Sequence, residues 1–372
     1  MTCSNIRDVS SIQQAQKAKS EMTKNLPVNT RSEWVNVATD AMWDAMRKAV
    51  IGWPHLGEDQ NVNRLESMIA DLTGKAASVF LPTTNCANLL AMMGLCDNCD
   101  QVIMENRCHL WWVEQNIPRL TGASPRMLAG NKLGEMDLDE VAAVIEEQRY
   151  GMKPSTAVVC LENSHNVCGG VALPPSYLAQ AAEVAHQLGV SLFVDGARLF
   201  NAAAAHQVPL REMVAEVDVL SLSLNKGLGA PFGAMLCGSE EFILQARENH
   251  KILGSHSIHK AGFLAAGAIV ALETMLDRLP EDHVRAQKLA HLLVDIPGLN
   301  VDLETVQTNI VRVEPETMSP RDFASQVEAK GVGVMVLDQR AVKFITHYGI
   351  DDAGVEFVAK IAQEVMATNA NK

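Results

Sequence analysis

The sequence of 372 residues lacks any run of about 18 uncharged apolar residues, which is the length that a membrane-spanning helix needs. Its first 25 residues are polar throughout and lack the apolar core of a secretory signal. We therefore expect neither a transmembrane helix nor a membrane as partner, and we predict a cytoplasmic location.

An excess of positive charge is also absent. The formal net charge is −13, and the acidic residues are spread along the chain rather than gathered in a tail. Neither nucleic acid nor an anionic membrane is an expected partner of such a chain. Any site for an anionic ligand must therefore be built locally.

Cysteine occurs eight times, but without the spacing of a disulfide framework or a metal site. Most of the cysteines lie inside apolar segments, as reduced thiols of a cytosolic protein do. Cys96 and Cys99 form one C-x-x-C, and no second Cys or Cys/His pair follows at zinc-finger spacing. We interpret this pair as a coincidence and expect no metal; a metal site or a redox pair is the alternative.

Short apolar runs rich in Val, Leu and Ile alternate with longer amphipathic segments in the first two thirds of the chain. The apolar runs predict strands at 77–81, 101–104, 157–161, 191–194, 217–222 and 233–236. The amphipathic segments predict helices at 41–50, 62–72, 87–95, 138–148 and 177–188. Such alternation is typical of βαβ units, so we expect an α/β fold with a mostly parallel sheet covered on both faces.

The regular alternation of strands and helices predicted for the first part of the chain ends at about residue 255. Helices are predicted at 261–276, 282–293, 320–330 and 352–367, with short strands at 308–313, 333–337 and 342–346. We expect a large domain at 26–255 and a small α/β C-terminal domain at 256–372. Residues 1–25 are polar and aperiodic, which predicts an arm that is disordered or lies on a neighbouring subunit.

An acid and a lysine follow two of the predicted strands. Asp195 comes directly after SLFV, and Lys226 comes after VLSLSLN and before Gly-Leu-Gly-Ala-Pro. Ligands of open α/β sheets bind at the carboxyl ends of the strands. A buried acid there needs a cationic partner, such as a pyridinium nitrogen. A lysine beside glycines in a desolvated pocket has the room and the lowered pKa that a Schiff base requires.

Each of these two patterns is short, and a lone loop lysine is usually solvated. The surrounding segments are more specific: they read ENSHNVCGGVALP, FVDGARLFNAAAA and DVLSLSLNKGLGAPFGAMLCGS. In order and spacing they resemble the threonine aldolase group of the β-eliminating lyases, which are fold-type I pyridoxal phosphate enzymes. The likeness runs from residues 30–34 through 56–66 to 344–356 and so covers nearly all of the chain except the N-terminal arm.

The resemblance implies a fold-type I transferase-like α/β fold and pyridoxal 5′-phosphate as the cofactor. It implies that Lys226 forms the Schiff base with the cofactor and that Asp195 pairs with the pyridinium nitrogen. Arg198 would bind the substrate carboxylate or the ring hydroxyl, because its fork suits a bidentate carboxylate contact. A salt bridge on the surface is the alternative for Arg198.

Two histidines receive roles from the same resemblance. His109, in ENRCHLWWVEQ, corresponds to the histidine that stacks on the cofactor ring, and the alternative is a hydrogen-bonded core histidine. His165, in ENSHN, corresponds to the histidine that contacts the β-hydroxyl of the substrate. A neutral imidazole there would serve as a general base. A hydrogen-bonded loop histidine is the alternative for His165.

Thr84 and Asn85 occupy the positions of a Gly-Thr pair that binds the cofactor phosphate in the family. They precede a predicted helix at 86–95, and a helix N-terminus offers free N–H groups and the positive end of the helix dipole. We therefore expect a phosphate cradle built without lysines. Plain N-capping by Thr or Asn is the alternative, and both roles are compatible.

Several departures from the family pattern lie around the expected substrate. Ser32 keeps a serine near the substrate carboxylate, but Glu33 and Trp34 stand in place of Asp-Thr. Lys343 replaces an arginine, so a bidentate carboxylate clamp becomes a point charge, for which Arg340 is a candidate substitute. The remaining departures are Leu56 and Val113 in place of tyrosines, and His256 and His259 in a segment that is rich in glycine in the family. We expect intact cofactor chemistry and an altered side-chain pocket; drift without a change of specificity is the alternative.

The resemblance implies a lyase that cleaves a β-hydroxy-α-amino acid, a small-molecule substrate, into glycine and an aldehyde. His165, directly or through a water, would take the β-hydroxyl proton. The same cofactor also supports β-elimination or dehydration to an α-keto acid and transfer of the glycyl unit to a second aldehyde, and these are the alternatives. A scaffold that has lost catalysis is a further alternative, against which the four residues Lys226, Asp195, Arg198 and His109 argue together.

Fold-type I enzymes build each active site at a subunit interface. The resemblance therefore implies a homodimer or a homotetramer of this chain.

Overall fold

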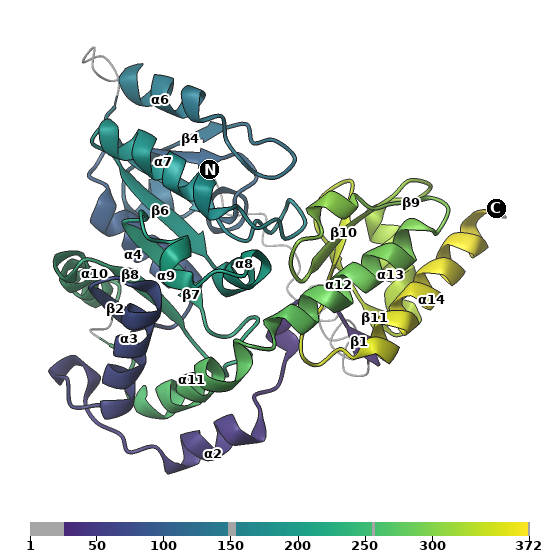
Figure 1. Ribbon diagram of the computed structural model, residues 1–372, viewed down its shortest axis with the longest axis horizontal. Helices are drawn as coiled ribbons and strands as arrows, with labels where there is room; N and C mark the ends of the chain where they lie inside the picture. The colour runs from purple at the N-terminus through teal and green to yellow at the C-terminus, as the bar shows by residue number, and fades with distance from the viewer. Residues whose placement is uncertain (1–25, 148–153, 255–256, 371–372) are drawn as a thin grey trace, which may run out of the picture.

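The computed structural model describes residues 26–147, 154–254 and 257–370 (Figure 1). The predicted N-terminal arm and His256 lie outside the described residues. Among the described helices, none is both long and apolar enough to cross a membrane. The cytoplasmic location stays a prediction.

A seven-stranded sheet forms the centre of the larger part of the molecule. Its order is β2 (Ala77–Leu81), β8 (Ala234–Gly238), β7 (Val219–Ser223), β6 (Ser191–Gly196), β5 (Thr156–Glu162), β3 (Gln101–Glu105) and β4 (Ser124–Leu128). Strand β8 runs antiparallel to both of its neighbours, and the other pairs are parallel. The predicted fold class, an α/β fold with a mostly parallel sheet flanked by helices, is confirmed.

Helices cover both faces of this sheet, because side chains of a strand point to the two faces in turn. In β6, Leu192 and Val194 enter one apolar cluster, and Phe193 between them enters the other. The first cluster is covered by α2 (Asp40–Lys48), α3 (Gln60–Thr73), α6 (Leu138–Glu146), α7 (Pro175–Gln187), α8 (Leu199–His206), α9 (Leu210–Met213) and α11 (Gly262–Met275). The second is covered by α4 (Thr84–Leu95), α5 (Ile117–Leu120) and α10 (Glu240–Ile252).

A separate apolar cluster lies among the C-terminal elements, which Figure 1 shows to one side of the large sheet. Its antiparallel sheet has the order β12 (Met335–Val336), β13 (Val342–Ile345), β10 (Ile310–Pro315) and β9 (Leu299–Asn300). Helices α12 (Leu279–Val294), α13 (Pro320–Ala329) and α14 (Asp352–Ala370) pack on it. We propose that this cluster marks the small C-terminal domain. The apolar helix α11 instead packs on α2 and α3, beside the large sheet.

One strand joins the start of the described chain to this C-terminal part. Strand β1 (Val28–Asn29) pairs in parallel with β11 (Val332–Gly333). The backbone N–H of Ile345 also donates to the carbonyl of Thr30. The residues that follow β1, including Ser32 and Glu33, are thereby held between the two parts of the molecule.

Most of the predicted elements lie within a few residues of those observed, but several observed elements were not predicted. Strand β4 was not predicted, because three of its five residues are exposed and its sequence SPRML lacks an apolar run. The amphipathic helix α10 was also not predicted. Strand β8 was predicted as a strand, but its antiparallel direction follows from the short connection after β7, which cannot hold a crossover helix.

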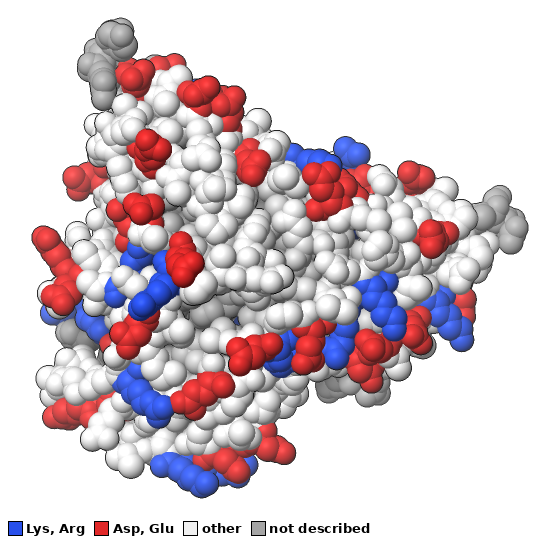
Figure 2. Space-filling model, viewed as in Figure 1, with Lys and Arg blue, Asp and Glu red and all other residues white. Residues whose placement is uncertain are grey.

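Acidic and basic side chains are interspersed over the face of the molecule in Figure 2. Several of them pair between neighbouring elements; Lys288 of α12, for example, lies 2.9 Å from Glu356 of α14. Exposed pairs of this kind contribute little to stability, so the fold depends mainly on its apolar clusters.

Phe193 tests this dependence, because its side chain is fully buried in the middle of β6. We expect Phe193→Ala to lower the free energy of unfolding by about 3–5 kcal/mol, since it removes packing and leaves a cavity. Urea unfolding followed by circular dichroism measures the change. Val284→Ala, at an exposed position of α12, is the control and should change stability by less than about 0.5 kcal/mol. Equal effects of the two substitutions would contradict this account.

Candidate active site

A pocket of about 410 Å³ lies at the carboxyl ends of β6 and β7. Its lining residues are Trp34, Asn36, Thr83, Thr84, Asn85, Asn88, His109, Asp195, Ala197, Asn225, Lys226, Gly229, Ala230 and Pro231. The predicted site residues among them are Thr84, Asn85, His109, Asp195 and Lys226. The predicted site residues that are not among them are Ser32, His165, Arg198 and Lys343.

Asp195 is the last residue but one of β6, and its carboxylate is almost fully buried. One oxygen accepts a hydrogen bond from the Asn88 amide at 3.0 Å, and the other accepts from the backbone N–H of Ala197 at 3.2 Å. Burial and the neighbouring Glu162 carboxylate raise the pKa of Asp195 to about 6, although His109 and Lys226 oppose the rise. The acid therefore lacks a full cationic partner of its own.

Lys226 lies in the loop that leaves β7, and its side chain is buried. Burial and the Arg198 guanidinium lower its pKa to about 8, against the opposing charges of Asp195 and Glu33. The Trp34 ring lies beside the ammonium, with 5.9 Å from Nζ to the ring centroid. A lysine with this pKa carries a useful fraction of neutral, nucleophilic amine near neutral pH.

The loop after Lys226 needs glycine at one position. Gly229 has a φ of +64°, and a Cβ atom added there would lie 2.8 Å from the Tyr348 ring. Both the left-handed backbone and the close approach exclude a larger side chain. The loop folds back through a hydrogen bond from the Gly229 N–H to the Lys226 carbonyl.

His109 is held by a carboxylate on its own turn. Its Nδ1 lies 3.0 Å from Oε1 of Glu114, at the end of the π-helical turn Leu110–Glu114. Asn88 also donates to that oxygen, at 2.9 Å, so one amide bridges Glu114 and Asp195. Burial acts to lower the pKa of His109, but Glu114 and the charge of Asp195 raise it above the ordinary value. The imidazole is thus fixed in orientation at the pocket wall.

Helix α4 points its N-terminus at the pocket. The structure places the N-cap at Thr83, whose hydroxyl accepts from the Cys86 N–H at 3.1 Å, so the N-cap is neither Thr84 nor Asn85. These two residues form the first turn, where backbone N–H groups have no acceptor within the helix. They line the pocket and present those groups and the helix dipole to an anion.

Arg198 forms a buried ion pair instead of lining the pocket. Its Nε and one terminal nitrogen each donate to a carboxylate oxygen of Glu33 at 2.7 Å. Both side chains are buried, which also differs from the surface salt bridge considered from the sequence. Charge from Glu33 raises the pKa of Arg198, although burial acts against this.

His165 lies in a buried cluster of charges. Its Nε2 is 3.2 Å from Glu105, and its Nδ1 accepts from the Cys168 N–H at 3.4 Å. Burial acts to lower the pKa of His165, but Glu162, Cys168 and Glu105 raise it to about 10. The neighbouring carboxylates therefore favour the protonated imidazole, whereas the Cys168 N–H favours an unprotonated Nδ1. The expected role of His165 as a neutral general base stays a prediction.

Ser32 and Lys343 are both buried beside the pocket residues. Ser32 caps the short helical turn Glu33–Val35 by accepting from the Trp34 N–H at 3.3 Å. Lys343 of β13 donates to the Asn166 side chain at 2.6 Å, and burial and Arg198 lower its pKa to about 7. Arg340 is largely exposed and pairs with Glu314 at 3.2 Å. The other departures that are described, Leu56, Val113 and His259, are exposed.

Three residues of this site were not predicted from the sequence. Asn88 is polar inside an otherwise apolar helix and lies one turn after Thr84, which was a usable signal. Glu114 lies five residues from His109, a spacing that only a π-helical turn places on one side. Glu33 was noted as a departure, but its pairing with Arg198 joins residues far apart in the chain.

The raised pKa of His165 predicts how the free energy of unfolding depends on pH. Because the folded value of about 10 lies above the ordinary 6.5, the imidazolium stabilises the fold below about pH 6.5. This contribution is lost as the pH rises toward 10. We expect the stability difference between the native protein and His165→Gln to shrink by roughly 2–4 kcal/mol between pH 6.5 and 10.

Urea unfolding at a series of pH values measures this difference. His186→Gln is the control, because this half-exposed histidine pairs with Asp218 at the surface. A stability difference for His165→Gln that stays constant with pH would contradict the prediction.

Comparison with known proteins places this architecture in a family. The family model for beta-eliminating lyase matches residues 30–316. Low-specificity L-threonine aldolase 1 of Arabidopsis thaliana is 34% identical over 347 residues, which cover 92% of this chain and 97% of that protein. Low specificity L-threonine aldolase of Escherichia coli K12 is 32% identical over 336 residues, which cover 90% of this chain and 97% of that protein.

Solved structures agree on the fold. A threonine aldolase of Leishmania major superposes with a TM-score of 0.78 at 15% identity, over 91% of this chain and 100% of that chain. A putative L-allo-threonine aldolase of Listeria monocytogenes superposes with a TM-score of 0.76 at 20% identity, over 94% of this chain and 99% of that chain. The family model spans most of the chain, and the sequence relatives extend over nine tenths of it. The chain therefore belongs to the beta-eliminating lyase family.

Proposed function

We propose that the protein is a pyridoxal 5′-phosphate-dependent aldolase that cleaves a β-hydroxy-α-amino acid into glycine and an aldehyde. The observation that carries this proposal is that Asp195 and Lys226, both buried, line one pocket at the ends of neighbouring parallel strands. The relatives named threonine aldolase support the same reaction class. The sequence departures around the substrate support an aldehyde side chain other than that of threonine.

The residues present fit this cofactor. Asp195 is a buried acid whose raised pKa reflects the lack of a full cationic partner, and a pyridinium nitrogen would supply one. Lys226 is a buried amine with a lowered pKa. The first turn of α4, at Thr84 and Asn85, would bind the phosphate. When bound, the cofactor supplies an electron sink for the breaking Cα–Cβ bond.

The protein groups then have separate tasks. With the cofactor bound, Asp195 would keep its ring nitrogen protonated, and Asn88 holds that carboxylate in place. His109 would contact the ring, and Glu114 fixes the orientation of its imidazole. Lys226 would hold the cofactor through its amine and, when free, would exchange protons within the pocket. The role of His165 as the β-hydroxyl base stays a prediction, since its ring lies against Glu105.

Lys226 gives the direct test of cofactor binding. The native protein loaded with pyridoxal 5′-phosphate should absorb near roughly 420 nm, and borohydride should fix the added mass on Lys226. Lys226→Ala should lose both the band and the added mass. Lys288→Ala, at a surface lysine of α12, is the control that should keep both. A native protein that stays colourless would contradict the cofactor assignment.

The products of the loaded protein distinguish the reactions. We expect glycine and an aldehyde from a panel of β-hydroxy-α-amino acids. Ammonia and an α-keto acid without glycine would instead identify β-elimination or dehydration. A glycine product that appears only with a second aldehyde present would identify the transfer reaction.

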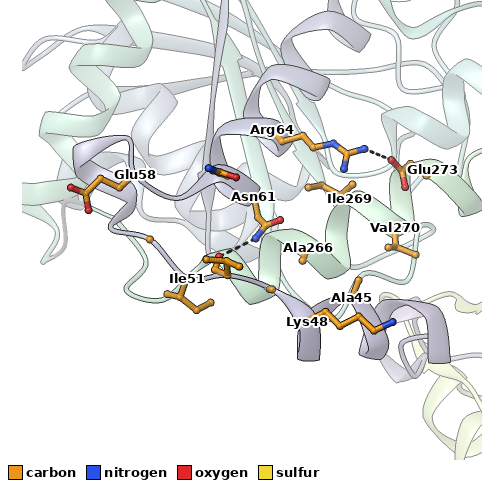
Figure 3. A pocket seen from close by; sticks show the side chains of 14 residues that line it. Ala45, Lys48, Ile51, Glu58, Asn61, Arg64, Ala266, Ile269, Val270 and Glu273 are labelled. Carbon is orange, nitrogen blue, oxygen red and sulfur yellow. Dashed lines mark hydrogen bonds and ion pairs between the residues drawn. The ribbon is translucent and has the colours of Figure 1, made fainter.

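We further propose that copies of this chain associate as a homodimer or homotetramer. The segment 37–56, which contains α2 and leads to α3, exposes six large apolar side chains, namely Val37, Trp43, Val50, Ile51, Trp53 and Leu56. A second pocket of about 350 Å³ lies beside this 37–56 surface, between α2, α3 and α11 (Figure 3). The Arg64–Glu273 ion pair ties α3 to α11 across it. Exposed apolar surface of this extent favours a protein partner, and a second copy is the one that the family resemblance implies.

Light scattering after size exclusion measures the association. We expect the mass of two or four chains, and we expect Ile51→Asp with Trp53→Asp to shift the protein toward the single chain by about tenfold or more in dissociation constant. Val284→Asp, at an exposed apolar position on α12, is the control. A native protein of single-chain mass would contradict the proposal.

A further inference from the structure

A buried ion pair lies next to the candidate active site. Glu33 precedes Trp34, and Arg198 follows Ala197, and both of these neighbours line the pocket. The two oxygens of Glu33 accept from Nε and one terminal nitrogen of Arg198 at 2.7 Å each. The Asn309 amide adds a third hydrogen bond to Glu33, at 2.9 Å.

This two-bond contact is the geometry by which an arginine recognises a carboxylate. Here the carboxylate comes from the protein itself, so one edge of the Arg198 fork is filled and its charge is balanced. Burial acts to raise the pKa of Glu33, but Arg198, Asn309 and Lys226 together hold it well below its usual range. Glu33 therefore stays charged at physiological pH, and protonation does not release the fork.

The other cationic side chains near the pocket do not fully replace Arg198 as a partner for a substrate carboxylate. Among the described residues that line the pocket, Lys226 is the only lysine or arginine, and the proposed function engages it with the cofactor. Lys343 is buried on Asn166 and is not among the lining residues. Its pKa of about 7, lowered by burial and Arg198, leaves it partly neutral at physiological pH.

The pocket offers a neutral polar group close to the same turn. Asn36 lines the pocket, and both its amide nitrogen and its oxygen are buried without a hydrogen-bond partner among the described residues. Buried amides are costly when unpaired, so this side chain is suited to a polar ligand group. An amide can both donate to a hydroxyl and accept from it, whereas it can only donate to a carboxylate.

We infer that Glu33 is a specificity-determining residue, which occupies one edge of the Arg198 guanidinium, balances its charge and so lets the pocket accept substrates that lack an α-carboxylate. This inference rests on the proposed function, because it concerns the substrate of the same pocket. The added substrate class is 2-amino-1,3-diols, in which a hydroxymethyl group replaces the carboxylate of a β-hydroxy-α-amino acid.

The reaction of such a diol is the same cleavage. The bond between the amine-bearing carbon and the substituted carbinol carbon breaks. Its electron pair stays on the amine-bearing carbon, which takes up a proton, and the hydroxyl loses its proton as the carbinol becomes an aldehyde. The products are 2-aminoethanol and the aldehyde, where the amino acid would give glycine and the aldehyde.

Binding of the two amine products tests the inference without turnover. Glycine and 2-aminoethanol are titrated by calorimetry into the protein loaded with pyridoxal 5′-phosphate. We expect the native protein to bind them with dissociation constants within about tenfold of each other, because its carboxylate contact is weak. Native protein that binds glycine about a hundredfold tighter or more would overturn the inference.

Two substitutions open the fork in different ways. Glu33→Gln keeps the shape of the side chain and removes its negative charge. Glu33→Asp keeps the charge but shortens the side chain by one methylene, which moves the carboxylate away from Arg198. Each substitution should lower the dissociation constant of glycine by about tenfold or more and change that of 2-aminoethanol by less than about threefold. If Glu33→Gln fails to fold because the charge of Arg198 is left without a partner, the glycine affinity of Glu33→Asp tests the inference. Folded variants with unchanged glycine affinity would overturn the inference.

Glu66→Gln is the matched control, since it breaks the Glu66–Arg247 ion pair away from the pocket and should move neither affinity. Failure of the proposed function is read separately, from aldehyde release. A loaded protein that releases no aldehyde from either substrate class would refute the aldolase. The glycine to 2-aminoethanol ratio of the Glu33 variants would still report on the fork.

Discussion

The structure of this site depends on the compensation of buried charges. At the carboxyl ends of the central strands, water is largely excluded, and a single uncompensated charge would be costly. Acids and bases therefore occur there in mutual contact, with Glu33 on Arg198 and Glu105 on His165. Asp195 is one of the exceptions. Its neighbours satisfy it by hydrogen bonds and leave its pKa raised, and that incomplete compensation is what suits it to a cationic cofactor ring.

Sheet topology brings these charges together. Glu162 of β5 lies in register with Asp195 of β6, and Asp195 lies in register with Ser221 of β7. Since the three strands are parallel, all of their polar ends point to the same edge of the sheet. The antiparallel return of β8 turns the chain just beyond that edge and so creates the loop that carries Lys226. The positions of acid and lysine are thus consequences of strand order.

The two carboxylates Glu33 and Asp195 show how one kind of group acquires different roles. Glu33 is paired by two hydrogen bonds from a guanidinium and stays ionised. Asp195 accepts from an amide and a backbone N–H, beside the like charge of Glu162. One group is balanced within the protein and the other remains open to a ligand. The same contrast separates Arg198, whose charge Glu33 balances, from Lys226, which has no carboxylate partner within hydrogen-bonding distance among the described residues.

The sequence by itself determined most of the strands and helices, the family, and the placement of Asp195 and Lys226 at the ends of strands. Apolar periodicity is local, and an acid or lysine directly after a buried strand has little freedom in where it lies. Tertiary structure alone decided that Arg198 pairs with Glu33, that His165 contacts Glu105, and that Asn88 and Glu114 support Asp195 and His109. Each of these depends on a partner that is distant in the chain or that only a π-helical turn brings near. The charge and hydrogen bonding of a buried group follow from such partners rather than from its own identity.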